Sequence, residues 1–180
     1  MLRSHVGACQ ETSDVRHPLL GSGRVANGVT WVEQMSSLRM TPTEREAFLA
    51  EPHLCALAVE QADRPPLVVP VWYLYDNALV SIHTARGQLK TELLRRAGRF
   101  SVCIQTYQVP YRYVSAEGAI VAIEPIPASE REAMVARYLS PEQGTMYLRR
   151  TEAVASDDVA VRMRPERWRT VDFSRDVDGF

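Results

Sequence analysis

The sequence predicts a mainly β domain, an antiparallel barrel with peripheral helices. Most of its apolar stretches are short, rich in β-branched and aromatic residues, and bounded by turn residues, which is typical of strands. Turns rather than crossover helices join most of these stretches, and this argues against a doubly wound parallel sheet. The length of 180 residues fits one domain, and the 46% of hydrophobic residues suffice for a substantial core.

A capping box opens the first predicted element. Thr41 can accept from the backbone three residues on, Glu44 can bond back, and Pro42 suits the first helical position. We therefore predict a helix from Thr41 that Pro52 ends. Three strands follow, the last two as a hairpin: residues 53–60, 67–75 and 78–84.

A second helix is predicted over residues 88–99, where leucines share one face and arginines the other. Two strands follow, over residues 100–107 and 111–123. Gly118 interrupts the longer strand, and a glycine inside a strand predicts a β-bulge.

The last part of the chain predicts one more helix and two closing strands. Residues 129–132 read as a second capping box, which opens a helix that ends before Pro141. The closing strands are predicted over residues 159–163 and 168–173, on either side of Pro165.

Residues 1–39 differ from the rest, with four glycines, scattered polar residues and no sustained periodicity. We expect a disordered extension or an over-long gene start here, since Met35 and Met40 could both begin the chain. The alternative is an arm that packs on a partner subunit. Order is expected to begin at Thr41, within a folded domain that spans residues 40–180.

The charge balance excludes one class of partner. With 21 Lys+Arg against 22 Asp+Glu, the net charge of −1 argues against a strongly basic nucleic-acid binder. No apolar run reaches about 18 residues, so no membrane span is expected, and no secretory signal is visible near the start. We expect a cytoplasmic protein.

Metal and nucleophile motifs are not found. The three cysteines are widely spaced and match neither a disulfide framework nor a CxxC site. The histidines (His5, His17, His53, His83) lack ligand spacing, so no metal is expected. There is no GxSxG elbow and no Walker loop.

The most informative stretch is a predicted strand–loop–helix corner around the only lysine, Lys90. Free backbone N–H groups at a helix start attract anions. Thr84 adds a hydroxyl and Arg86 a guanidinium suited to phosphate, while Gly87 permits close backbone approach. Because a cation in the first turn opposes the helix dipole, Lys90 needs a compensating anion. The alternative is an ordinary solvated corner.

Two further stretches allow both a functional and a purely structural interpretation. Pro70 marks a strand edge, because proline cannot donate in a central ladder, and Trp72 and Tyr73 could flank a planar ring or belong to the core. Residues 110–113 place two tyrosines around Arg112, which suits a dimer seam or plain structural packing.

Four segments and a closing stretch together resemble one family. They are residues 40–54, Val69-Pro70-Val71-Trp72-Tyr73, Thr84-Ala85-Arg86-Gly87-Gln88-Leu89-Lys90 with the arginines that follow, residues 110–118, and residues 165–173. This arrangement resembles the split-barrel flavoproteins related to pyridoxamine 5′-phosphate oxidase. More narrowly, it resembles the actinobacterial deazaflavin-dependent branch that uses coenzyme F420.

The resemblance implies a six-stranded antiparallel split β-barrel with peripheral helices, acting as a homodimer with cofactor sites at the interface. It implies that the corner holds the cofactor phosphate through His83, Thr84, Gln88 and Lys90. The strand with Pro70, Val71 and Trp72 would lie along the ring system. Gln88 replaces the Arg or Ser common in the family, which weakens an FMN clamp, and the closing signature of vitamin B6 oxidation is missing.

The expected activity is hydride transfer from reduced coenzyme F420 to an unsaturated acceptor of enone, quinone or tetrapyrrole type. The alternatives are an FMN-binding oxidase or reductase, or a non-catalytic flavin or tetrapyrrole carrier. No catalytic residue is assigned, although Tyr73, Tyr111 or Arg112 could polarise a carbonyl.

Overall fold

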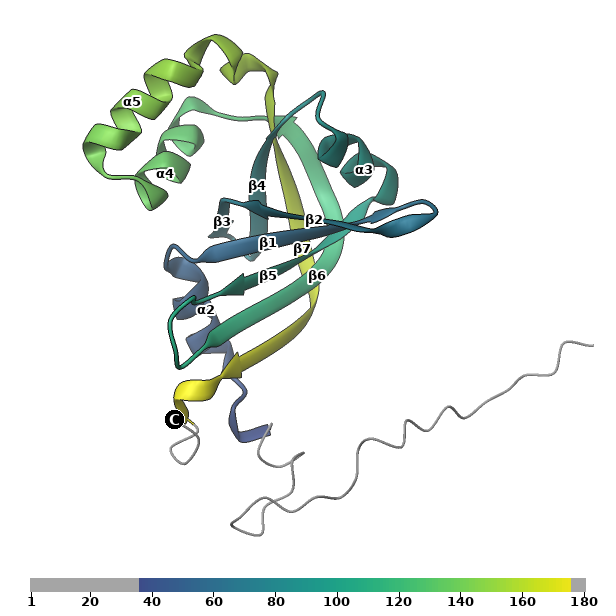
Figure 1. Cartoon of the computed structure of the whole chain (residues 1–180), viewed down its shortest axis with the longest axis vertical. Coiled ribbons are helices and arrows are strands. Elements are labelled where there is room, and N and C mark those ends of the chain that lie inside the picture. Colours follow the sequence, from purple (N-terminus) through teal and green to yellow (C-terminus); the bar gives the residue numbers. More distant parts are fainter. Residues whose placement is uncertain (1–35, 176–180) are drawn as a thin grey trace, which may run out of the picture. The chain divides into compact units, whose positions relative to one another are not determined.

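Seven antiparallel strands form one curved sheet in the computed structural model, which describes residues 36–175 (Figure 1). Their order in the sheet is β2-β1-β5-β6-β7-β4-β3, so β2 and β3 are the two edges. The strands are β1 (Leu54–Gln61), β2 (Arg64–Val71), β3 (Tyr73–Asp76), β4 (Leu79–Ala85), β5 (Arg99–Gln105), β6 (Arg112–Pro125) and β7 (Asp158–Asp172). The predicted antiparallel split barrel is confirmed, with seven strands rather than six.

The individually predicted strands also number seven, but two of their boundaries differ, the first because the chain changes partner at Trp72. The single strand predicted over residues 67–75 is two strands: β2 pairs with β1, with Val69 opposite Leu57, and β3 pairs with β4. Pro70 lies in the edge strand β2, as predicted. Conversely, the two closing strands predicted around Pro165 are one continuous strand, β7.

Gly118 lets β6 and β7 stay paired past Pro165. Glu117 pairs with Arg167 and Gly118 with Pro165, which leaves one residue of β7 unpaired and confirms the predicted bulge. A Cβ at position 118 would lie 1.9 Å from the carbonyl oxygen of Arg164. Glycine is required because the neighbouring backbone occupies that space.

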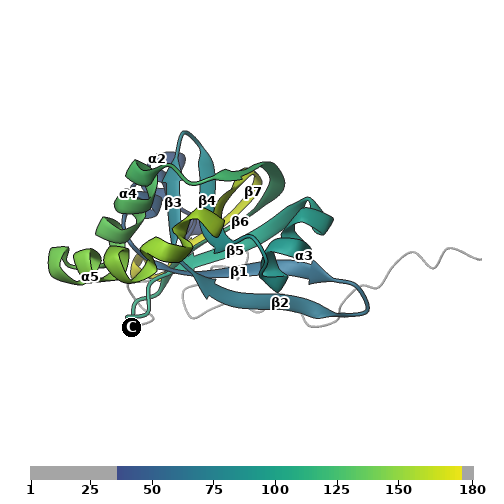
Figure 2. The same cartoon turned by 90° about the horizontal axis from the view of Figure 1, so that it is seen from above.

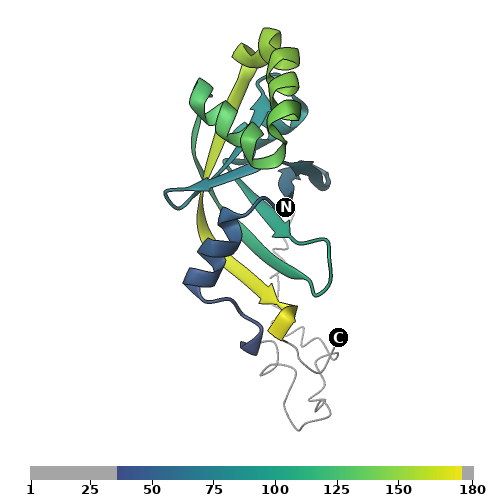
Figure 3. The same ribbon diagram turned by 90° about the vertical axis from the view of Figure 1, so that its left-hand side faces the viewer.

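Four α-helices flank the sheet: α2 (Pro42–Ala50), α3 (Leu89–Ala97), α4 (Ala128–Tyr138) and α5 (Pro141–Thr151), with short 3-10 turns η1 (Glu152–Asp157) and η2 (Phe173–Arg175). The α4–α5 pair lies near the start of β7, and α2 lies near its end (Figures 1 and 3). Seen from above, α3 and the α4–α5 pair lie on either side of β4 (Figure 2). None of the helices in the described part is long and apolar enough to cross a bilayer.

Two of the helix predictions need correction. The Thr41–Glu44 capping box is confirmed. The second box, predicted at residues 129–132, is wrong, because α4 begins at Ala128 after Pro127 and its N-cap makes no side-chain hydrogen bond. The helix α5 was not predicted; its own capping box joins Ser140 and Gln143, with Pro141 at the first position.

The described part of the domain includes residues before the expected start at Thr41. Leu38 is 2% exposed, and its carbonyl accepts a hydrogen bond from the Asp172 N–H at 2.8 Å. The Met40 N–H donates to Thr170 Oγ1 at 3.0 Å. The prediction for residues 1–35 lies outside the described residues.

The core consists of buried apolar side chains from six of the strands, and partly buried side chains of β2 pack against it. Its largest fully buried members are Tyr73, Leu49, Leu57, Ile82, Leu94, Ile104 and Met163. Helices α2 and α3 close this core through Phe48, Leu49 and Leu94. This packing holds the end of β4 and the start of α3 rigidly in place, and the pocket described next opens there.

Candidate functional site

A pocket of about 660 Å³ opens between the β4–α3 corner and the α4–α5 helix pair. Seven of the nine predicted site residues line it: Pro70, Val71, Trp72, His83, Thr84, Gln88 and Lys90. They come from β2, the break after it, β4 and the start of α3. The fold therefore brings together two stretches of sequence that are a hairpin apart.

The β4–α3 corner is held by a chain of hydroxyl contacts. Thr84 Oγ1 donates to Gln88 Oε1 at 3.3 Å and lies 3.0 Å from Thr91 Oγ1. Thr91 in turn donates to the carbonyl of Ala85 at 2.7 Å. These bonds fix the turn, but no side chain caps α3 at Gln88.

The start of α3 therefore offers free donors to the pocket. In the described part of the chain, the backbone N–H groups of Leu89 and Lys90 make no hydrogen bond. Unpaired N–H groups and the positive end of the helix dipole together favour an anion at this place.

Lys90 is half-buried at the same corner. Burial lowers the pKa of its ammonium, and the nearby Asp158 carboxylate acts in the opposite direction. No ion pair of Lys90 is found among residues 36–175. A half-buried cation without a close counter-ion would be stabilised by an anionic ligand.

Arg86 and Gly87 do not line the pocket. The Arg86 N–H donates to the carbonyl of Asp157, its own carbonyl accepts from Arg95, and its side chain is exposed. A Cβ at position 87 would meet no atom within 4 Å, so the chain itself does not approach Gly87 closely. Their roles in cofactor binding remain predictions, because neither residue lies in the wall of the pocket.

Aromatic side chains form the opposite wall. The Trp72 indole stacks on the Tyr138 ring, with centroids 5.1 Å apart and planes 4° from parallel. Tyr147 of α5 lies 5.4 Å from the same indole at a tilt of 47°. Trp72 thus lines the pocket, while its ring is also packed against rings of its own chain.

A charged network supports the floor of the pocket. His83 Nε2 lies 3.0 Å from Glu130 Oε1, which also accepts from Ser81 Oγ at 3.2 Å. The Arg162 guanidinium donates to both oxygens of Glu130 and, through Nε, to Glu124 at 2.6 Å.

The balance of this network keeps Glu130 ionised. Burial raises the pKa of its carboxyl, but hydrogen bonds from Arg162 and His83 outweigh burial, so the net pKa lies below its ordinary value. Within the described ranges, no group of three or more His, Cys, Asp or Glu residues is arranged to hold a metal ion.

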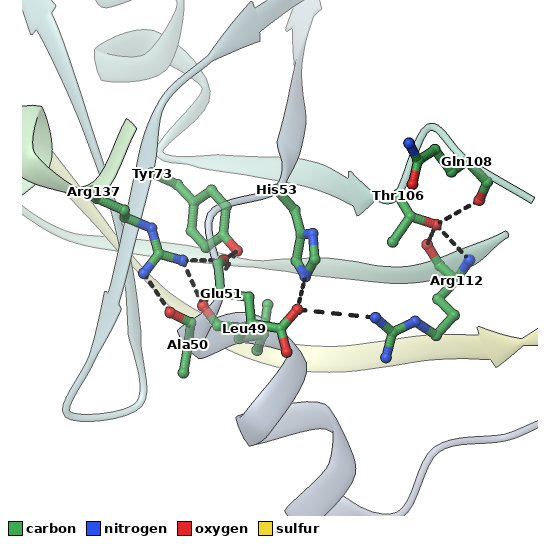
Figure 4. A network of polar contacts seen from close by, with 9 residues as sticks. All are labelled: Leu49, Ala50, Glu51, His53, Tyr73, Thr106, Gln108, Arg112 and Arg137. Atoms are coloured by element: carbon green, nitrogen blue, oxygen red, sulfur yellow. Dashed lines mark hydrogen bonds and ion pairs between the residues drawn. The ribbon is translucent and has the colours of Figure 1, made fainter. Parts of the chain in front are cut away.

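A second network lies beside the pocket mouth and joins α2 to α4 (Figure 4). The Arg137 guanidinium donates to the last carbonyls of α2, those of Leu49 and Ala50 at 2.7 Å each, and to the carbonyl of Glu51. His53 lies 3.3 Å from the Glu51 carboxylate and lines the pocket. Burial lowers the pKa of His53, so its ring is neutral at pH 7.

The three residues considered as carbonyl-polarising groups do not line the pocket. Tyr73 is fully buried, and its hydroxyl donates to the carbonyls of Leu49 and Glu51. Arg112 lies 3.9 Å from Glu51, and Tyr111 is an exposed side chain on the surface. Their contacts are structural.

Sequence reasoning missed the wall that α4 and α5 contribute. Its residues share an origin in these helices or the connections beside them: Ile126, Arg131, Met134, Val135, Tyr138 and Tyr147. A signal for α5 was present, since Ser140-Pro141-Glu142-Gln143 is a capping box with proline at the first helical position.

One family model matches most of the chain. The family model described as pyridoxamine 5′-phosphate oxidase matches residues 41–172. No curated protein matches the chain.

Solved structures share the fold at low sequence identity. A conserved hypothetical protein from Mycobacterium tuberculosis is 22% identical, with a TM-score of 0.63 over 78% of this chain and 89% of that one. A protein described as an F420 reductase is 19% identical, with a TM-score of 0.52 over 69% and 94%. An FAD-binding protein from Mesorhizobium loti is 19% identical, with a TM-score of 0.50 over 73% and 94%.

Proposed function

The chain belongs to the pyridoxamine 5′-phosphate oxidase family, and from this premise we propose that it is an oxidoreductase that binds a flavin-type cofactor in the pocket between α3 and the α4–α5 pair. The observation that carries the proposal is Lys90. It is a half-buried ammonium in the first turn of α3, beside free backbone N–H groups and without an ion pair in the described part of the chain.

The residues present fit such a cofactor. A pocket of about 660 Å³ lies within the range of roughly 300–1,000 Å³ that is usual for small-molecule sites. One end offers Thr84, Gln88, Lys90 and backbone N–H groups to a phosphate. The other end is lined by Trp72 and apolar side chains from α4, which suit a tricyclic ring.

We further propose that the cofactor is coenzyme F420 and that the acceptor is an unsaturated small molecule of enone, quinone or tetrapyrrole type. When bound, the reduced deazaflavin supplies a hydride to a polarised double bond. The fold shared with an F420 reductase supports this choice. FMN is the second candidate, supported by the fold shared with an FAD-binding protein.

The chain's own part in this reaction is binding, orientation and exclusion of water. Lys90 and the start of α3 hold the anionic end of the cofactor. Met134 and Val135 are buried against the pocket and keep its inner wall dry. This apolar wall favours an acceptor that presents a flat apolar face.

The proposal includes a homodimer whose second copy covers the pocket mouth. Leu54 and Tyr107 line the pocket, although 57% and 78% of their surfaces are exposed. Val68 and Val109 add exposed apolar surface on the strand and loop beside them. Exposed apolar groups around a pocket are typical of a surface that binds a partner.

The decisive experiment is a paired titration of the purified protein with coenzyme F420 and with FMN, followed by quenching of cofactor fluorescence. We expect tight binding of the deazaflavin. Tight binding of FMN alone would move the proposal to an oxidase or flavin reductase, and binding of neither would contradict the phosphate site. Binding without turnover of enone, quinone or tetrapyrrole acceptors would indicate a carrier instead.

The dimer is tested separately by light scattering, with Tyr107→Glu as the variant. A charge on this exposed ring should convert dimers to monomers without unfolding the chain. A monomeric wild-type protein would contradict the dimer proposal.

A further inference from the structure

Glu130 connects a helix to two strands through its contacts with His83, which lines the pocket, and Arg162. It lies in the first turn of α4, while His83 lies on β4 and Arg162 on β7. Its Oε1 is 3.0 Å from His83 Nε2, and its Oε2 accepts from Arg162 at 2.6 Å. A single carboxylate therefore joins the helix pair to the neighbouring strands β4 and β7, next to a residue that lines the pocket.

The protonation of this carboxylate decides which nitrogen of His83 carries a proton. Hydrogen bonds from Arg162 and His83 hold the pKa of Glu130 below its ordinary value, so it is ionised at neutral pH. An ionised carboxylate only accepts hydrogen bonds. His83 Nε2 must therefore be the donor, and a ring that carries a single proton then has its lone pair on Nδ1.

The other ring nitrogen remains available to a ligand. His83 lines the pocket, and Nδ1 has no hydrogen bond to any residue in the range 36–175. It is also not among the buried polar atoms that lack a partner, so it is open to solvent. Since His83 lines the pocket, a ligand bound there is the available partner for Nδ1.

We propose that Glu130 is a positioning residue, which fixes His83 in the Nε2–H form and presents Nδ1 to the cofactor. The inference rests on the proposed function for the identity of the ligand, but the tautomer itself does not depend on it. A neutral ring accepts from an N–H or O–H of the ligand through Nδ1, and a protonated ring donates to an anion through the same atom.

The charges around His83 fit this role. Glu130 lies on the α4 side, and Arg162 of β7 offsets the charge of Glu130. Glu124, at the end of β6, binds Arg162 from the far side. The remaining charged groups that line the pocket are Lys90, Arg131 and Asp158, with the neutral His53 at the mouth.

The variant Glu130→Gln tests the inference with little change in shape. An amide keeps an acceptor at only one of the two oxygen positions, so its NH2 group replaces either the oxygen that faces His83 or the oxygen that Arg162 Nη2 contacts. The matched control is Glu124→Gln, which also contacts Arg162 but does not touch His83.

The ¹⁵N chemical shifts of the His83 ring in the full-length protein report its tautomer. The signals of this ring are identified by their absence from the spectrum of His83→Asn. We expect the Nε2–H form in the wild type and in Glu124→Gln. In Glu130→Gln we expect a shift toward the Nδ1–H form. Affinity for the cofactor that the wild type binds should fall about tenfold in Glu130→Gln, the effect of losing one ordinary hydrogen bond to Nδ1, and by less than about twofold in Glu124→Gln.

The results separate the two proposals. A His83 ring in the Nδ1–H form in the wild type, or an unchanged tautomer in Glu130→Gln, would overturn the positioning role even if the cofactor binds. The expected tautomers in a protein that binds neither F420 nor FMN would support the role of Glu130 and contradict the proposed function.

Discussion

The hydroxyl of Tyr138 lies 3.2 Å from both the backbone nitrogen and the backbone oxygen of Tyr73. It accepts from the N–H and donates to the carbonyl, at the point where the chain leaves β2 and enters β3. The same ring stacks on Trp72. One side chain of α4 thus joins the strand break, the helix pair and the aromatic wall of the pocket.

Replacing Tyr138 with phenylalanine should separate these contributions. The stacking on Trp72 is kept, but both hydrogen bonds to Tyr73 are lost, and Tyr73 is fully buried. We expect the free energy of unfolding to fall by about 1–2 kcal/mol, measured by urea unfolding at an unchanged m-value. Tyr147→Phe is the control, because that ring also contacts Trp72 but no hydrogen bond of its hydroxyl is found in the described part. Equal stability of both variants would contradict the bridging role.

Removing the ammonium of Lys90 should weaken cofactor binding selectively. Lys90→Ala is expected to lower the affinity by roughly 10- to 150-fold, since a charge-assisted hydrogen bond contributes about 1.5–3 kcal/mol. The control Arg96→Ala removes an exposed cation from the same helix outside the pocket. Fluorescence titration of both variants measures the effect, and an unchanged affinity in Lys90→Ala would make Lys90 an ordinary surface cation.

Because β7 approaches Gly118 closely, we predict that adding one methyl group at this position strongly lowers the free energy of unfolding. In Gly118→Ala, the new Cβ would meet the Arg164 carbonyl oxygen at 1.9 Å, so the two strands must separate. We expect a loss of about 3 kcal/mol in unfolding free energy, against less than about 0.5 kcal/mol for Gly87→Ala, where the space is open. Comparable losses in the two variants would contradict a cost that is specific to the close contact at Gly118.

Glu44 predicts a specific sensitivity to acid. Hydrogen bonds from the backbone and side chain of Thr41, and then from Arg175, lower the pKa of Glu44 from 4.5 to about 2. Because the folded pKa lies below the unfolded value, the stabilisation is present above pH 4.5 and is lost as the pH falls toward 2. Glu44→Gln should therefore be less stable than the wild type at pH 6, with the difference shrinking toward pH 2. Thermal unfolding across this range measures it, and an equal difference between the two proteins at pH 6 and at pH 2 would contradict the role of Glu44.

Features that depend on neighbouring residues could be predicted from the sequence. The capping box at Thr41 and the bulge at Gly118 each follow from local chemistry, and both are confirmed. The break at Trp72 could not be predicted, because residues 67–75 form an uninterrupted β-prone stretch. Only the pairing of β2 with β1 and of β3 with β4 reveals it, and these partners are set by the whole sheet.

The same distinction between local and tertiary determinants explains which parts of the candidate site could be predicted. The corner around Lys90 is contiguous in sequence, and its lining of the pocket follows from the turn between β4 and α3. Glu130 was assigned to a helix cap because its local pattern fits one, yet its partners His83 and Arg162 are 47 and 32 positions away. The aromatic wall from Tyr138 and Tyr147 depends equally on tertiary contacts.

The burial of Leu38 sets a limit on how far the domain can be shortened. A version of the chain that starts at Met40 would expose the site where Leu38 packs and would leave the Asp172 N–H without its acceptor. Loss of a buried leucine side chain alone costs about 1.5–3 kcal/mol, a large share of the stability of a small domain. Of the two candidate starts, Met35 and Met40, Met35 is therefore the one from which a minimal folding unit can be expressed, since it retains every described residue from 36 onward.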